Sequence, residues 1–184
     1  MPNWCDNNVE IRGPEESVKK LVDLVQTNAK NRAAAFPEAE EVSLSLLQTF
    51  LPISDYYRGI EGFNNGGYEW CLQNWGCKWP ESYLHLIPVS DGVDLIFDTP
   101  WSPPTEGYHY ISTKFPDLMF FHYFRDEGMI FMGIEVYQNG MVIFENEIDG
   151  SFLPEFEDWS EIEDYLEDLK TDLFTSAHNA VSIA

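Results

Sequence analysis

Hydrophobic and polar residues alternate from Asn8 to Arg12, which predicts a short strand with Val9 and Ile11 on its buried face. A helix start follows at Gly13-Pro14-Glu15-Glu16, because proline fits the first helical turn and acidic side chains favour the positive end of the helix dipole. Apolar residues then recur at the spacing of one helix face, at Val18, Leu21, Val22 and Val25. The chain is therefore expected to begin with a strand and an amphipathic helix.

The pattern between residues 34 and 82 is less regular. A short second helix fits Glu38 to Leu51, and a turn is expected at Phe63 to Gly67 because of its glycines and asparagines. Three tryptophans and two cysteines are concentrated in Tyr68 to Pro80. We interpret 34–82 as an irregular, tryptophan-rich insertion that packs on the main sheet.

From Leu84 onward, short alternating segments separated by turn residues predict antiparallel strands. Asn139-Gly140 is a strong signal for a tight hairpin. The expected strands are 84–89, 93–98, 118–124, 129–137 and 141–148, with a helix over 105–115 among them. This order predicts an α+β fold in which helices cover one face of an antiparallel sheet.

A last helix is expected from about Ser160 to Phe174, followed by a frayed tail over 175–184. Its buried stripe is predicted at Trp159, Ile162, Leu166, Leu169 and Leu173. We interpret 1–184 as a single domain in which 150–184 forms an acidic, helical C-terminal extension.

The net charge of the chain restricts the classes of function that are expected. The 184 residues include 10 Lys and Arg against 32 Asp and Glu, a formal net charge of −22. Such a field repels phosphate backbones, so direct binding of nucleic acid is not expected. Single-strand binding on an aromatic sheet would also need local positive charge, which the sequence does not offer.

Three cysteines, Cys5, Cys71 and Cys77, are too few and odd in number for a disulfide scaffold, which favours reduced thiols in the cytoplasm. The chain has no signal-peptide pattern and no apolar run long enough to span a bilayer, so we expect a soluble cytoplasmic protein without membrane contact. A cysteine–histidine pair across the fold stays open, between Cys71 or Cys77 and His85 or His122.

Motifs for known chemistry are missing from the sequence. It has no Gly-x-Ser-x-Gly elbow, no phosphate-binding loop and no dinucleotide-binding glycine motif. Asp94 and Asp98 would lie about 13 Å apart along one strand, too far for a shared metal site. We therefore assign no catalytic residue, metal ligand or cofactor.

Acidic residues are concentrated from Glu145 to Asp172, with twelve acids against the single base Lys170. Like charges four residues apart on a helix destabilise it by roughly 0.2–0.5 kcal/mol per pair. The candidate partner-binding face consists of Glu161, Glu163, Asp164, Glu167, Asp168 and Asp172. It is either an anionic surface for a basic partner, in its sharpest form a mimic of DNA, or a solvated face that keeps the chain soluble.

Two further segments, Trp75 to Trp79 and Thr99 to Pro104, combine indoles with a lone lysine and a rigid proline turn. The candidate ligand-binding residues are Trp75, Lys78, Trp79, Trp101 and Ser102. Stacking of the Lys78 ammonium on an indole would contribute ~0.5–2 kcal/mol. Two interpretations stay open: the tryptophans anchor the insertion to the sheet, or they line a small pocket in which Lys78 contacts an anion.

These segments also carry a family resemblance. The motifs are the opening MPNWC with Asn7-Asn8, WG-x-KW at 75–79, and T-x-WSPP at 99–104 followed by a predicted helix and Phe115-Pro116. With them the chain, from residue 1 to about 140, resembles the YubB-like proteins with a ferredoxin-like domain, carried by phages, conjugative plasmids and enterobacterial mobile elements.

The resemblance implies a ferredoxin-like fold without an iron–sulfur cluster, since three scattered cysteines cannot supply four cluster ligands. It implies no catalytic residues, but it does imply an accessory protein of a mobile genetic element. With the charge, this leads us to expect a non-enzymatic binding or modulator protein whose acidic surface contacts a basic host protein. The alternative is a small-ligand or enzymatic site at the Trp75–Trp79 and Trp101–Pro104 loops.

Overall fold

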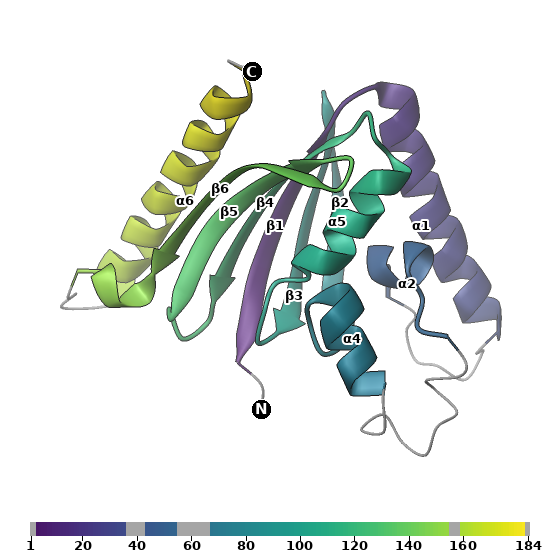
Figure 1. The fold of residues 1–184 in the computed structure, drawn as a ribbon, viewed down its shortest axis with the longest axis horizontal. Coiled ribbons are helices and arrows are strands. Elements are labelled where there is room, and N and C mark those ends of the chain that lie inside the picture. Colours follow the sequence, from purple (N-terminus) through teal and green to yellow (C-terminus); the bar gives the residue numbers. More distant parts are fainter. Residues whose placement is uncertain (1–2, 36–42, 55–66, 155–158, 183–184) are drawn as a thin grey trace.

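The computed structural model describes residues 3–35, 43–54, 67–154 and 159–182 (Figure 1). Its elements are, in chain order, β1 (Trp4–Arg12), α1 (Glu15–Ala35), α2 (Leu46–Phe50), α4 (Gly67–Trp75), β2 (Ser82–Val89), β3 (Gly92–Pro100), α5 (Thr105–Lys114), β4 (Met119–Asp126), β5 (Phe131–Gln138), β6 (Met141–Asp149), the 3₁₀ turn η1 (Gly150–Phe152) and α6 (Trp159–Ser182). The predicted strands and the helix at 105–115 are confirmed, with ends displaced by up to four residues.

The six described strands form one sheet in the order β2-β3-β1-β4-β5-β6, and every neighbouring pair is antiparallel. This confirms the predicted α+β class. The N-terminal strand β1 lies inside the sheet, between β3 and β4. At the β5–β6 turn, Asn139 and Gly140 both adopt positive φ, 51° and 75°, as a tight two-residue hairpin requires.

Helices cover both faces of this sheet, with α6 on the side opposite to α1, α2, α4 and α5 (Figure 1). On the first face, alternate residues such as Val9, Leu95 and Phe120 pack with Leu21 and Ile111. The second face presents the intervening residues to α6, and its apolar cluster consists of Phe121, Tyr123, Ile134, Val136, Leu173 and Ala177. Strand β4 is therefore buried on both sides, which explains its nearly continuous apolar sequence.

Two local predictions need correction. The C-terminal helix continues to Ser182, so the expected frayed tail over 175–184 is wrong for the residues that the structure describes. The reason is that the apolar stripe continues past Leu173, with Ala177 fully buried and Val181 packed on the same cluster. In addition, the tryptophan-rich segment contains a regular helix, α4, which buries Cys71 and Trp75, four residues apart, on one face.

Other expectations in the insertion are tested only in part. The second helix expected over 38–51 is shorter, since α2 starts at Leu46, and residues 38–42 lie outside the described part of the chain. The turn predicted at 63–67 also lies outside it, except for Gly67.

A buried carboxylate attaches α2 to the sheet and to α5. Glu81, which is 3% exposed, accepts hydrogen bonds from Ser45 Oγ (2.5 Å) and from the backbone N–H groups of Leu46 (3.0 Å) and Leu47 (3.1 Å). The hydroxyl of Tyr108 donates a fourth, at 3.0 Å. Burial raises the pKa of Glu81, while these four donors favour its charged form. One side chain therefore satisfies the free N–H groups at the start of α2.

A second buried polar chain crosses the sheet at its centre. Asn7 uses its amide nitrogen to donate to Thr99 Oγ1 (2.9 Å), so its oxygen faces His122 Nε2 (3.0 Å). This assigns the ring proton of His122 to Nε2 and leaves Nδ1 to accept from the Tyr137 hydroxyl (3.3 Å). Thr99 in turn donates to the carbonyl of Ser102 (2.8 Å). Burial lowers the pKa of His122 to about 3, so the imidazole is neutral at physiological pH.

The neutral state of His122 predicts a loss of stability in mild acid. Between pH 6.5 and about 3 the unfolded chain binds a proton at this histidine and the native protein does not. The unfolding free energy of the protein relative to a His122→Gln variant should therefore fall by about 1 kcal/mol per pH unit below about pH 6.

Urea denaturation of both proteins between about pH 7 and 4 measures this difference. Groups common to both proteins, Glu81 among them, cancel in the comparison. A difference that stays constant over this range would contradict a neutral, buried His122.

Candidate functional site

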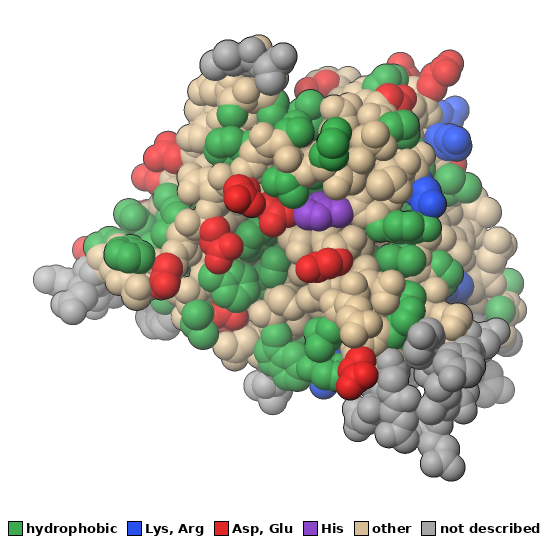
Figure 2. All heavy atoms as spheres, viewed as in Figure 1, with side chains coloured by type: hydrophobic (Ala, Val, Ile, Leu, Met, Phe, Trp, Pro, Cys, Tyr) green, Lys and Arg blue, Asp and Glu red, His purple; other side chains and the backbone are tan. Residues whose placement is uncertain are grey.

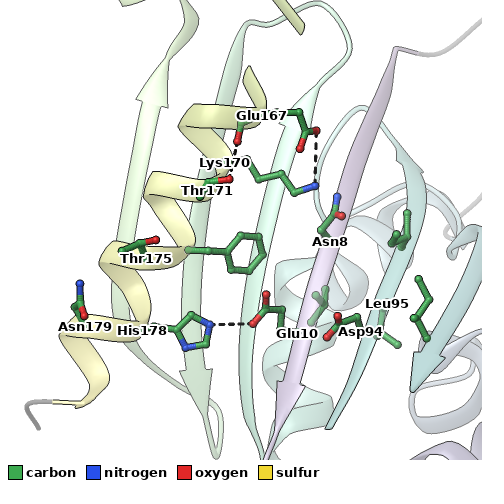
Figure 3. A pocket seen from close by; sticks show the side chains of 14 residues that line it. Asn8, Glu10, Asp94, Leu95, Glu167, Lys170, Thr171, Thr175, His178 and Asn179 are labelled. Carbon is green, nitrogen blue, oxygen red and sulfur yellow. Dashed lines mark hydrogen bonds and ion pairs between the residues drawn. The ribbon is translucent and has the colours of Figure 1, made fainter. Parts of the chain in front are cut away.

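A groove lies between α6 and the part of the sheet that α6 does not cover. The helix packs on β4, β5 and β6, so β1, β3 and β2 stay open on this side. The groove has a volume of about 560 Å³. Its lining includes Asn8, Glu10 and Asp94 from the strands and Lys170, Phe174 and His178 from α6 (Figure 3).

One end of the groove is held by a cluster of charged side chains. Glu10 and Asp94 lie directly opposite each other on β1 and β3, where two like charges destabilise a sheet. Arg12 bridges them, with Nη2 3.0 Å from Glu10 Oε2 and Nη1 2.6 Å from Asp94 Oδ1. From α6, His178 places Nε2 2.9 Å from Glu10 Oε2 (Figure 3). Its ring also stacks on Phe121, at 4.0 Å between ring centroids. This cluster fixes the C-terminal end of α6 on the sheet.

A second pair of carboxylates lies on the same face, four residues along each strand. Asp6 and Asp98 are also direct cross-strand neighbours, and Arg125 forms an ion pair with Asp6. Desolvation, together with the negative charges of Asp6 and Glu127, raises the pKa of Asp98. We call this surface of β1, β2 and β3 the open half-face; its side chains include Asp6, Asn8, Glu10, His85, Ile87, Asp94, Ile96 and Asp98.

The acidic face of α6 is exposed to solvent, and one of its residues, Glu167, also lines the groove. All six of its predicted residues, Glu161, Glu163, Asp164, Glu167, Asp168 and Asp172, are exposed. The opposite side of the helix carries the buried Leu166 and Leu173. Lys170 lies 3.9 Å from Glu167 and 5.7 Å from the Tyr123 ring, so it faces inward, along the sheet. Figure 2 shows acidic side chains over α6 and the neighbouring strands, and basic ones along the edge formed by α1.

The density of these charges is close to that of a nucleic acid strand. Eleven residues separate Glu161 from Asp172, about 16 Å of helix. The six carboxylates thus follow at about one per 3 Å, against one phosphate per 3.4 Å for one strand of DNA.

The structure brings three of the five predicted ligand-binding residues together. Lys78 Nζ lies 4.6 Å from the centroid of the Trp101 ring, 5.1 Å from that of Trp79 and 5.8 Å from that of Tyr68. Trp75 instead is buried and donates its indole N–H to the Leu51 carbonyl at 2.8 Å.

The loop that carries Trp101 is firmly held. The Ser102 hydroxyl donates to the Gly76 carbonyl at 2.6 Å, which joins the two loops, and the Trp101 N–H donates to the Asn3 carbonyl at 2.9 Å. Trp101 has a φ of 67°, a conformation that costs energy for a bulky residue, and its side chain is 44% exposed. Lys78 has no carboxylate within ion-pair distance among the described residues, so its ammonium is surrounded by aromatic rings instead.

The structure does not form the cysteine–histidine pair that the sequence left open. Both ring nitrogens of His122 are engaged by Asn7 and Tyr137. Burial raises the pKa of Cys71 to about 11 and that of Cys77 well above its usual value, which disfavours the nucleophilic thiolate. Within the described ranges, no group of three or more His, Cys, Asp or Glu side chains is placed to hold a metal ion.

Sequence reasoning missed the groove. Alternation along β1 and β3 places Glu10 and Asp94 on the face away from the main core, but it does not reveal which residues pair across the strands. His178 was missed because it lies in the segment predicted to fray. The available signal was the continuation of the apolar spacing at Ala177 and Val181.

The aromatic contacts of Lys78 predict a measurable coupling energy. In a double-mutant cycle of Lys78→Met and Trp101→Leu, we expect about 1 kcal/mol of interaction energy in the unfolding free energy, from cation–π attraction. A parallel cycle of Lys78→Met with Phe152→Leu should give none, because Phe152 is 82% exposed and lies in η1. Equal coupling energies in the two cycles would show that the rings do not hold the ammonium.

Comparison with known proteins identifies a family with the same domain. A family model described as the ferredoxin-like domain in Api92-like protein matches residues 74–171, just over half of the chain. The matched region extends into α6 and includes its acidic residues up to Asp168. No curated protein matches the chain. Among the described helices, none combines the length and apolar character needed to cross a membrane.

A solved structure has a similar architecture. The crystal structure of the protein Api92 from Yersinia pseudotuberculosis aligns with a TM-score of 0.55 at 11% identity, and the alignment covers 85% of this chain and all of that one. At this identity the likeness is one of fold, and it agrees with the antiparallel sheet and helices found here. The chain belongs to the family of Api92-like proteins that carry this ferredoxin-like domain.

Proposed function

We propose that this protein is a non-enzymatic accessory protein that binds and modulates a basic partner protein through the acidic face of α6. The observation that carries the proposal is the exposure of all six carboxylates of this face, at a spacing close to that of phosphates along one DNA strand. In its sharpest form, the surface mimics DNA toward a protein that normally binds DNA.

The position of α6 on the sheet leaves its carboxylates accessible to a partner. Its apolar stripe, through Leu166, Leu173 and Ala177, anchors it to the sheet, and His178 fixes its end to Glu10. Packing therefore compensates for the repulsion within the helix, which lacks interleaved lysines apart from Lys170. A helix selected only for stability would alternate acidic and basic residues on its exposed side.

The proposed setting is the cytoplasm of a bacterium that carries a phage or conjugative plasmid. The resemblance of the MPNWC, WG-x-KW and T-x-WSPP motifs to YubB-like proteins supports a mobile genetic element as the source. All three cysteines are free and buried, as suits a reducing compartment. An accessory protein that acts on a host protein fits this setting.

Charge reversal on α6 tests the proposal. The variant Glu163→Lys, Glu167→Lys, Asp168→Lys should fail to retain the basic protein that the unmodified chain captures from a bacterial lysate, because attraction is replaced by repulsion. Mass spectrometry identifies the captured protein, and its loss at about 300 mM salt compared with about 50 mM is expected for an electrostatic contact.

The matched control reverses three exposed acids elsewhere, Glu16, Asp23 and Glu69, and has the same net charge. It should retain the partner. Capture by both variants, or by neither protein including the unmodified one, would contradict the proposal. Competition by a DNA duplex for the same partner is the additional result expected of a DNA mimic.

A second candidate function rests on the cluster around Lys78. The Lys78 ammonium contacts three aromatic rings and, among the described residues, no carboxylate, and it lies beside the half-exposed indole of Trp101, whose backbone is strained. Such an arrangement can bind a small planar anion. In this function the Trp101 ring stacks on the ligand and Lys78 contacts its negative group.

Tryptophan fluorescence tests this second function. Titration with a panel of nucleotides and anionic metabolites should change the emission of the unmodified protein, and the change should disappear in Lys78→Ala. The Lys114→Ala variant is the control, because Lys114 contacts a distant ring, Tyr110, at 4.3 Å. A panel without any effect on the emission would remove the support for a ligand site here.

A further inference from the structure

We infer that the groove beside α6 binds one amphipathic, basic helix of the partner protein, which lies along the open half-face. The inference takes one element from the proposed function, namely that the partner protein is basic. It places the contact on a different surface, since of the six residues of the acidic face of α6 only Glu167 is among those that line the groove.

The space fits a single helix. On this side of the sheet, β1, β3 and β2 lie next to one another with none of the described helices over them, which gives a width of about 14 Å at the usual strand spacing. Eight to nine residues per strand give a length of about 27–30 Å. A helix with its side chains is about 10–12 Å wide, and about 18 residues span that length. The structure itself has a helix, α6, on the other half of the same face.

The backbone of the open half-face favours a helical occupant over an extended one. β1 and β3 are each paired on both sides, so this surface offers side chains and no free backbone groups along these two strands. An extended segment on top of it would bury its own N–H and C=O groups without partners, whereas a helix satisfies them internally.

The charges of the groove select a basic occupant. The open half-face carries two cross-strand carboxylate pairs, Asp6 with Asp98 and Glu10 with Asp94; the second pair lines the groove, and α6 adds Glu167 at its wall. Among the described residues, the cations beside these groups are Arg12, Arg125, Lys170 and, when protonated, His178 and His85. Five carboxylates against three permanent cations leave the open half-face and the wall of the groove with a negative charge.

A basic occupant would stabilise Asp98 in particular. The Asp98 carboxylate has no hydrogen bond or ion pair in the described part of the chain, and its neighbours Asp6 and Glu127 are negative. A lysine or arginine of the partner would supply the missing counter-ion.

Between the two acidic pairs, Ile96 of β3 lies next to Asn8 of β1 and His85 of β2, and Ile87 lies beside the Glu10–Asp94 pair. Ile96 is 44% exposed and Ile87 is 42% exposed, and Phe174 of α6 forms part of the wall. The acidic pairs are four strand residues apart, about 13 Å, which matches positions i and i+8 of a helix at about 12 Å. The expected partner helix therefore has basic residues at i and i+8, with an apolar residue at i+4 that contacts Ile96.

A synthetic peptide of about 18 residues tests the inference on the full chain. The probe has leucines along one stripe and lysines at the i and i+8 positions beside it; the control peptide has the same composition in shuffled order. Fluorescence anisotropy should give at least about tenfold tighter binding for the patterned peptide. In NMR spectra, saturating peptide should shift the side-chain amide signals of Asn8 and Asn179, which line the groove.

Two variants locate the binding site. Ile96→Lys and Ile87→Lys should each lower the affinity for the patterned peptide by at least about tenfold, because apolar contact is lost and the new lysine repels the lysines of the peptide. Both positions are more than 40% exposed, so the fold should persist, and thermal unfolding checks it. Unchanged affinity in both variants, equal binding of the two peptides, or unshifted Asn8 and Asn179 signals would overturn the inference.

Lysate capture with the same variants separates the two proposals. If both the Ile96→Lys variant and the Glu163→Lys/Asp168→Lys variant lose the partner, the result supports partner contact at the groove and at the acidic face of α6. Loss only in Glu163→Lys/Asp168→Lys overturns the groove and keeps the acidic face. Retention in Glu163→Lys/Asp168→Lys with loss in Ile96→Lys overturns the acidic face of α6 as the contact.

Discussion

The helical layer on the first face of the sheet depends on a single buried carboxylate. Glu81 accepts hydrogen bonds from the start of α2 and from Tyr108 of α5, so it joins elements that are more than 25 residues apart in the chain. Removing it would leave the N–H groups of Leu46 and Leu47 buried without acceptors, which is costly. The loop that carries Lys78 lies between Trp75, at the end of α4, and Glu81, so its position depends on this contact as well.

The two faces of the sheet have different environments, and the alternating sequence of β1 serves both. β1 alternates strictly, with Cys5, Asn7, Val9 and Ile11 buried under the helices and polar residues on the other side. The polar side would be ordinary for a sheet with one solvated face. Because α6 covers half of that side, Glu10 of β1 comes to line a groove between helix and sheet, where Arg12 bridges it to Asp94, and Arg125 pairs with Asp6 farther along the strand.

Much of the fold could be predicted from periodicity, since strand alternation and helix stripes are local. The stripe of Val18, Leu21 and Val25 and the hairpin at Asn139-Gly140 needed no tertiary information. The helix α4 was missed because its buried residues, Cys71 and Trp75, are too few to establish a period within nine residues. The groove could not be predicted, because cross-strand partners and the side on which α6 packs are set by contacts between distant segments.

The place of β1 in the sheet also has a consequence for biosynthesis. Among the six described strands, β1 is synthesised first although it is an inner strand, and its neighbours β3 and β4 end only at Pro100 and Asp126. Nascent β1 has two unpaired edges until β3 is complete and one until β4 is complete, which is the condition under which chains associate wrongly. Asp6 and Glu10 interrupt its apolar pattern at regular intervals, as charged gatekeeper residues do. The same carboxylates that belong to the open half-face in the finished protein thus disfavour association of the growing chain with its copies.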